Sequence, residues 1–225
     1  MATMTGKLIL LSLALLYFVL VCNVSADGMI KVRLLHFLNP QGKGHNGHCC
    51  DGKFGICERN GCDHYFKMCL DAPGRRDKST ANCAYGKQIK IDPTIDQDQI
   101  TFTQRYKNVQ NPIAFEFNEP LPFETVLKVS IYDYDRWTKD DFVDRLEQPI
   151  TQLTDYPMDY ALQSRTTLRV QIFKECKPNY YGPRCTTACF PPTRGEYTCD
   201  QFTGRKICSL GWTGPSCDEV TGRHV

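Results

Sequence analysis

The 225-residue sequence has little net charge and no long run of charges of one sign. Its 27 basic and 25 acidic residues give a formal charge of +2, and no stretch contains more than two consecutive Lys or Arg residues. A sequence of this kind indicates neither a field that attracts nucleic acid nor a polybasic segment for a membrane surface. We therefore expect no nucleic-acid partner.

The sequence also lacks sustained helical periodicity and any motif around a catalytic nucleophile. Its histidines occur in strand, loop or tail contexts, at His36, His45, His48, His64 and His224. The adjacent carboxylates Asp140 and Asp141 point to opposite sides of an extended chain, so they do not form a catalytic pair. We expect no catalytic residues and no enzyme activity.

Cysteine, in contrast, is abundant: the chain has 13. One of them, Cys22, follows an apolar run from Leu8 to Val21 that is shorter than the roughly 20 residues of a membrane-spanning helix. Small residues at Val24-Ser25-Ala26 complete the pattern of a secretory signal peptide. We expect residues 1–26 to be removed by cleavage after Ala26 and the mature chain to be secreted.

The twelve remaining cysteines fall into two sets of six, separated by a long interval without cysteine. The first set is Cys49, Cys50, Cys57, Cys62, Cys69 and Cys83, and the second is Cys176, Cys185, Cys189, Cys199, Cys208 and Cys217. The second stretch has too few apolar residues to bury a core, so disulfides must stabilise it. The sequence predicts two disulfide-closed domains, at 27–173 and 174–218, and a tail at 219–225.

Period-two alternation of apolar and polar residues predicts that the first domain is an antiparallel β-sandwich. The expected strands lie around residues 30–34, 64–70, 99–103, 113–117, 127–131 and 168–172. Turn signals such as Asn39-Pro40, Pro73-Gly74 and Glu119-Pro120 separate them. The fold class is therefore mostly β.

A cysteine-rich loop, GKGHNGHCCDGKFGICERNGC, spans residues 42–62. Adjacent cysteines rarely reach disulfide geometry, so Cys49 and Cys50 must bond to separate partners. His45, His48 and His64 lie near these cysteines, but their spacing matches no zinc template. We expect oxidised cysteines here rather than a metal site.

An acidic stretch, VSIYDYDRWTKDDFVDR, spans Val129 to Arg145. Calcium binds six to eight oxygen ligands, which clustered carboxylates supply. The segment YDYDRWTKDD is similar to the third calcium loop of C2 domains, and this resemblance implies Asp133, Asp135 and Asp141 as calcium ligands. The alternative is a solvated acidic loop. Trp137 at the loop tip is suited to contact a phospholipid surface, and the alternative is that it packs on the neighbouring loop.

The six-cysteine stretch contains the motifs NYYGPRC, GEYTCD and GWTGPSCDE. Together they resemble the DSL (Delta/Serrate/Lag) domain of Notch ligands. Upstream, NGHCCDGKF and CDHYFKMCL resemble the C2-like N-terminal domain of the same ligands, and the Jagged/Serrate type in particular. The resemblance covers residues 28–218 and implies a C2-like sandwich followed by a small EGF-like disulfide module. It also implies sequential pairing, Cys176–Cys185, Cys189–Cys199 and Cys208–Cys217.

The resemblance further implies binding to the EGF-like repeats of a Notch receptor, through the segment from Cys185 to Cys199. The positions that match the contact motif are Ala188, Phe190, Pro192, Arg194 and Tyr197. This chain departs from the family pattern. Ala188 stands where the family has an aromatic residue, and Phe190 and Pro192 stand where it has arginines. Phe190 and Arg194 can substitute in part, because an aromatic residue and an arginine are common interface anchors.

The sequence leaves open whether the ligand is short and secreted or part of a longer one, and it also allows a different function. Ligands of the family normally continue with EGF-like repeats and a membrane anchor, whereas this sequence ends eight residues after Cys217. We expect either a secreted short ligand, acting as a co-ligand or antagonist, or part of a longer cell-surface ligand. The alternative function is that of a secreted, calcium-dependent lipid-binding C2 module.

Overall fold

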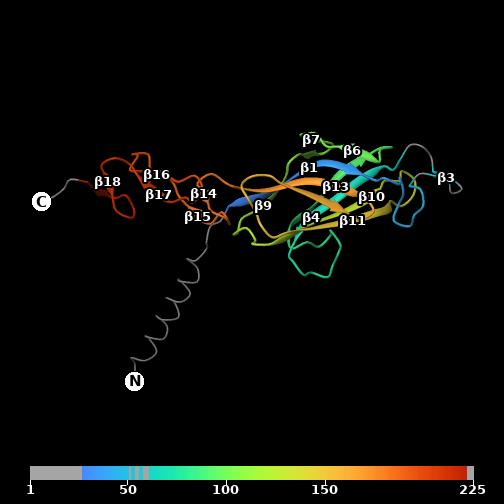
Figure 1. The fold of residues 1–225 in the computed structure, drawn as a ribbon, viewed down its shortest axis with the longest axis horizontal. Coiled ribbons are helices and arrows are strands. Elements are labelled where there is room, and N and C mark those ends of the chain that lie inside the picture. Colours follow the sequence, from blue (N-terminus) through green and yellow to red (C-terminus); the bar gives the residue numbers. More distant parts are fainter. Residues whose placement is uncertain (1–26, 51, 54–55, 58–60, 222–225) are drawn as a thin grey trace, which may run out of the picture.

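The structure is a computed structural model that describes residues 27–50, 52–53, 56–57 and 61–221, with only the backbone described for 52–53 and 56–57. The expected signal peptide and residues 222–225 of the tail lie outside the described residues. The molecule is elongated, with a β-sandwich at one end and a small disulfide-rich module in line with it (Figure 1). All regular elements of the described part are strands.

The strands of the sandwich alternate buried and exposed residues only in part, because two of them are almost completely buried on both faces. The strands of the sandwich are β1 (Gly28–Leu38), β4 (His64–Asp71), β5 (Tyr85–Thr94), β6 (Gln99–Thr101), β9 (Ile113–Phe117), β10 (Thr125–Asp133), β11 (Asp141–Ile150), β12 (Met158–Gln163) and β13 (Thr167–Cys176). Two short hairpins accompany them, β2 (Gly52–Lys53) with β3 (Ile56–Cys57), and β7 (Arg105–Tyr106) with β8 (Val109–Gln110).

Two sheets form the sandwich. One has the order β12-β13-β1-β6, with β9 also paired to β1, and the other has the order β11-β10-β4-β5. The core between them consists of the inward-facing apolar side chains of both sheets, among them Ile30, Val32, Phe66, Met68, Leu127, Val129, Val170 and Ile172. Each strand presents every second residue to this core because successive side chains point to opposite faces.

Strand β1 exchanges its partner on one side partway along its length. Its first half pairs with β9 and its last residues pair with β6. Between them, the side chain of Asn111 accepts a hydrogen bond from the Leu34 amide and donates one to the Leu34 carbonyl, both at 2.8 Å. Asn111 thereby satisfies the backbone where neither strand reaches, as buried polar groups require.

The six expected strands are all present, although β6 ends at Thr101 rather than Thr103. Three strands of the two sheets, β5, β11 and β12, were not expected, nor were the two short hairpins. β5 and β12 carry few buried residues, so their alternation is weak. The register of β11 shifts between Ile131 and Tyr132 of its partner β10, which breaks the period-two pattern that sequence reading depends on.

Disulfides close both regions that the cysteine count singled out. In the sandwich Cys50 bonds to Cys62 and Cys69 bonds to Cys83. Cys49 is also disulfide-bonded, so the two adjacent cysteines have separate partners, as expected. The side chain of Cys57 lies outside the described residues.

A buried ion pair lies on the outer side of the second sheet. Asp71 accepts a hydrogen bond from Lys128 Nζ at 2.6 Å, and both side chains are almost fully buried. Burial raises the pKa of Asp71, but the hydrogen bonds from Lys128 and from the amides of Ala84 and Ala72 outweigh it, so this pKa lies below its ordinary value. The pair therefore stabilises the fold only while Asp71 is ionised.

Asp71→Asn is expected to lower the free energy of unfolding by about 3 kcal/mol at pH 7, because it leaves the Lys128 ammonium buried without an anion. The pKa of Asp71 is lower in the folded protein than in the unfolded chain. The contribution of the pair to stability is therefore complete above the ordinary pKa of an aspartate. It is lost as the pH falls through the lower pKa of the folded state. Urea denaturation across pH measures both effects. Asp92→Asn, at an exposed site, is the control; an equal loss in both variants would contradict the prediction.

Candidate functional site

The module after β13 consists of three two-stranded pairs. They are β14 (Tyr180–Tyr181) with β15 (Thr187–Ala188), β16 (Tyr197–Cys199) with β17 (Lys206–Cys208), and β18 (Trp212–Thr213) with β19 (Glu219–Val220). Three disulfides join Cys176 to Cys185, Cys189 to Cys199 and Cys208 to Cys217. This is the sequential pairing that the resemblance implies. β19 extends the module to Val220, past the expected boundary at residue 218.

Tight turns inside the module depend on glycine. Gly204 is buried with φ +69°, and a Cβ atom there would lie 2.7 Å from the ring of Tyr181. Only glycine fits both the backbone conformation and the space. The ring of Tyr181 thereby packs directly on the turn between β16 and β17.

Polar and cation–π contacts fix the module to one side of the sandwich. The Nε of Arg184 donates a hydrogen bond to the Leu121 carbonyl at 2.7 Å, and the Arg184 carbonyl accepts one from the Leu121 amide at 3.2 Å. Its guanidinium lies 4.3 Å from the ring centroid of Phe123. The loop between β9 and β10 is thus attached to the first disulfide loop of the module.

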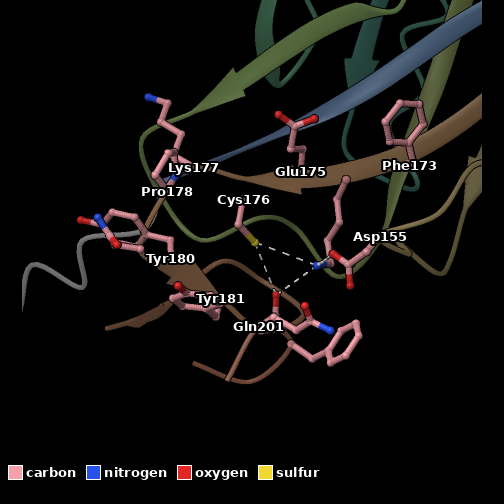
Figure 2. Close-up of a pocket in the computed structure, with 13 residues that line it drawn as sticks. Asp155, Phe173, Glu175, Cys176, Lys177, Pro178, Tyr180, Tyr181 and Gln201 are labelled. Carbon is pink, nitrogen blue, oxygen red and sulfur yellow. Dashed lines mark hydrogen bonds and ion pairs between the residues drawn. The ribbon is translucent and has the colours of Figure 1, made fainter. Parts of the chain in front are cut away.

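On another side, a hollow of about 410 Å³ separates the two domains. Figure 2 shows Asp155 from the sandwich on the same side of β13 as Tyr181 and Gln201 from the module, whereas Phe173 and Glu175 point to the other side. The buried ammonium of Lys174 crosses this junction, with hydrogen bonds to the Asp155 carboxylate and, at 3.1 Å, to the Gly182 carbonyl. These contacts, together with those of Arg184, set the angle between the domains.

The expected receptor-contact residues lie around the second disulfide of the module. Ala188, Phe190 and Arg194 are exposed, whereas Pro192 and Tyr197 are half-buried. Phe190 is 55% exposed, which is high for a large apolar side chain. The expected anchors are therefore accessible, and the other two positions shape the loop that carries them.

Three further contacts hold the loop. The hydroxyl of Tyr197 donates a hydrogen bond to the carbonyl of Phe190 at 2.8 Å. The Phe190 ring packs edge-on against Tyr180, with centroids 6.0 Å apart. Lys206, on β17, lies over the Tyr197 ring at 4.5 Å. Sequence reasoning missed Tyr180 and Lys206 as members of this site because they come from other loops of the module.

The acidic stretch lies at the end of the sandwich away from the module, after β10. Asp133 is fully buried, and its Oδ1 accepts the Asp63 amide at 2.6 Å. Asp141 is exposed and begins β11, where it pairs with Asp133 in the antiparallel register. The loop is thus shorter than the sequence suggested, and the expected third carboxylate belongs to a strand.

These positions do not assemble the expected calcium ligands. The carboxylate oxygens of Asp133, Asp135 and Asp141 are not among the described groups of three metal-binding side chains that lie within 4.8 Å of one another. A calcium ion needs six to eight converging oxygens. Calcium binding remains a prediction, but the three aspartates do not fit such a site here.

The two groups that do meet this distance criterion both contain Cys62, one with Cys50 and Asp133 and the other with His64 and Asp98. Cys50 and Cys62 are bonded to each other, so neither offers a thiolate. Oxidised cysteine in place of a zinc site agrees with the expectation for this loop.

A family model described as "N terminus of Notch ligand C2-like domain" matches residues 27–173, and one described as "Delta serrate ligand" matches residues 176–220. A solved Drosophila C2-DSL-EGF1 structure superposes with a TM-score of 0.66 and 27% identity, over 84% of this chain and 86% of that chain. The fold is therefore a C2-like sandwich followed by a DSL module.

Relatives over most of the chain include neurogenic locus protein delta of Drosophila melanogaster, 29% identical over 91% of this chain and 26% of that protein. Human protein jagged-1 is 28% identical over 98% of this chain and 19% of that protein. The chain thus spans about a quarter or less of these relatives. It belongs to the Notch ligand family of DSL proteins. No helix among the described residues is long and apolar enough to cross a membrane.

Asp135→Asn is expected to raise the thermal unfolding midpoint at pH 7 by about 2 °C. Burial and the negative charges of Asp141, Asp140 and Asp63 raise the pKa of Asp135. Since the pKa of Asp135 is higher in the folded protein than in the unfolded chain, ionisation of Asp135 makes the wild-type protein less stable as the pH rises. The variant has no carboxyl group at this position and does not lose this stability. Scanning calorimetry between pH 4 and pH 7 measures the difference.

The exposed substitution Asp218→Asn is the control for charge alone. Calcium at millimolar concentration should leave the midpoint of the wild-type protein unchanged, because the three aspartates do not converge. A calcium-dependent rise that Asp135→Asn abolishes would show instead that the loop closes around the ion.

Proposed function

We propose that this chain is an extracellular, non-enzymatic signalling ligand that binds EGF-like repeats of a Notch receptor through the loop from Cys185 to Cys199. Membership of the Notch ligand family supports the receptor class. The observation that carries the proposal is the exposed Phe190, which the module holds in a fixed position. The disulfides agree with an oxidising, extracellular compartment.

Two neighbouring side chains hold Phe190 in place. Tyr197 holds the Phe190 backbone through its hydroxyl, and Tyr180 packs against the Phe190 ring. An apolar side chain that is exposed and already ordered loses little conformational freedom when a partner covers it. Phe190 is therefore suited to enter an apolar depression on the receptor.

Positive charge surrounds this anchor. Arg194 is exposed in the same loop, and Lys206 extends over Tyr197. Aromatic and arginine side chains dominate the energetics of many protein interfaces. Ala188 and Pro192, which replace larger residues of the family pattern, contribute shape rather than an anchor. The complementary receptor surface should be apolar at its centre and acidic at its margin.

The alternative, a secreted calcium-dependent lipid-binding module, has one feature in its favour. Trp137 is 88% exposed on the loop between β10 and β11. The same loop does not bring its three expected calcium ligands together, so receptor binding is the better-supported function. Sedimentation with phospholipid vesicles distinguishes the two functions. Lipid binding requires that the protein sediments with vesicles only when calcium is present and that Trp137→Ala removes this binding.

Phe190→Ala and Arg194→Ala are each expected to weaken binding to a Notch ectodomain fragment about tenfold, because each removes an exposed anchor. Tyr197→Phe, which removes only the hydroxyl that holds Phe190, should weaken binding by a smaller factor and increase the dissociation rate. Biolayer interferometry with an EGF-repeat fragment measures both the affinity and the rates.

Thr198→Ala is the matched control. Thr198 is exposed on the same strand as Tyr197 but faces the other side, so the affinity should not change. The receptor assignment fails if the fragment does not bind the unmutated protein at micromolar concentration. The assignment of the loop fails if Thr198→Ala costs as much as Phe190→Ala.

A further inference from the structure

The outer face of the sheet β11-β10-β4-β5 carries a row of cations. Lys90 on β5 lies directly opposite Lys67 on β4. On the other side of Lys67, Ser130 on β10 is its partner, and Arg145 on β11 lies opposite Ser130. With neighbouring strands about 4.8 Å apart, the row extends over roughly 14 Å. Like charges on directly opposed residues destabilise a sheet, so the pairing of Lys67 with Lys90 calls for a reason other than folding.

Aromatic rings in the adjacent row hold these cations. Tyr65 stacks on Tyr132 with centroids 5.2 Å apart. The ammonium of Lys67 lies 4.7 Å from the Tyr132 ring, and that of Lys90 lies 4.7 Å from the Tyr65 ring. None of the carboxylates in the described part of the chain forms an ion pair with Lys67 or Lys90. Their charge is positioned but not neutralised.

The loop between β4 and β5 adds more positive charge to the same face. The Cys69–Cys83 disulfide and a hydrogen bond from Lys128 to the Asp77 carbonyl fix it over the sheet. Thr80 in this loop lies 3.4 Å from Ser130, the uncharged member of the row. Arg76 and Lys78 are exposed on it. In Figure 1 this loop extends from the sandwich on the side away from β7.

The charge of this region exceeds that of the whole molecule. Residues 64–92 contain six Lys or Arg residues and three Asp residues, a formal charge of +3, whereas the complete chain has +2. One of the three, Asp71, is buried and paired with Lys128. Asp77 is exposed on the β4–β5 loop, and the exposed Asp92 and Glu147 lie two residues after Lys90 and Arg145 on the edge strands β5 and β11. Asp140 accepts a hydrogen bond from the Tyr65 hydroxyl at 2.8 Å.

A spread of fixed cations over a flat sheet suits an extended polyanion better than a single anion. None of the large exposed apolar side chains of the described chain belongs to residues 64–92, so the β4–β5 part of this face has nothing to insert into a lipid bilayer. The expected signal peptide and the disulfides favour a location outside the cell, away from nucleic acids. Sulfate esters are the strong anions on extracellular polysaccharides, and ammonium and guanidinium groups bind them as they bind phosphate.

We propose that the face formed by Lys67, Lys90 and Arg145, together with Arg76 and Lys78 of the β4–β5 loop, binds a sulfated polysaccharide of the glycosaminoglycan type. The site is separate from the DSL contact loop, so it acts independently of receptor binding. It gives the ligand a second attachment, to the extracellular matrix or to the cell surface.

The test is binding of the secreted chain to immobilised heparin at increasing salt. The variant Lys67→Gln/Lys90→Gln/Arg76→Gln/Lys78→Gln is expected to bind at least tenfold more weakly in physiological salt. The slope of log affinity against log salt should fall by about 3, since four cation–sulfate contacts are lost. The control Arg105→Gln/Lys107→Gln removes two exposed cations from the β7–β8 hairpin and should change the affinity less than twofold.

Three results would overturn the proposal. Equal losses per removed charge in the control and in the quadruple variant would show non-specific attraction. Unmutated protein that binds chemically desulfated heparin as tightly as heparin would exclude sulfate recognition, and this comparison does not depend on the folding of any variant. Tighter binding to phosphatidylserine vesicles, lost in the quadruple variant, would assign the face to an anionic membrane.

Discussion

The antiparallel pairing of β1 with β13 is the interaction on which the rest of the molecule depends. It joins the first strand of the sandwich to the last, from Gly28 opposite Cys176 to Leu38 opposite Thr167. The DSL module starts where this ladder ends, and Cys185 packs into the core cluster of the sandwich. At Gly28 a Cβ atom would lie 2.7 Å from the Cys185 sulfur, so glycine permits this contact between the domains.

Much of the sandwich could be predicted because its central strands alternate strictly. β13 is such a strand, and β1 alternates from Gly28 to Leu34, before its own register shift. β11 escaped prediction because a register shift interrupts the alternation near its start. The disulfide framework of the module followed from the family resemblance. The contacts of Tyr180 and Lys206 did not, because they depend on which loops the disulfides bring together, and the spacing of residues does not reveal that.

The charged residues show the same limit, because neither the separation of the acidic residues nor the alignment of the basic ones could be predicted from the sequence. The acidic stretch is concentrated in the sequence, yet its three expected ligands Asp133, Asp135 and Asp141 are not among the described groups of side chains that converge within 4.8 Å. Lys67, Lys90 and Arg145 are scattered in the sequence, yet the register of four strands aligns them. A cluster along the chain is therefore weak evidence for a site, and strand pairing decides which charges meet.

The sequential disulfides of the module also determine how it carries mechanical load. Each bond spans nine or ten residues of sequence. Tension applied between the sandwich and the C-terminal end passes through the sulfur–sulfur bonds, because they are the shorter covalent path. The loop from Cys189 to Cys199, which holds Phe190 and Arg194, lies outside that path. The proposed contact surface can therefore keep its shape while the molecule around it is pulled.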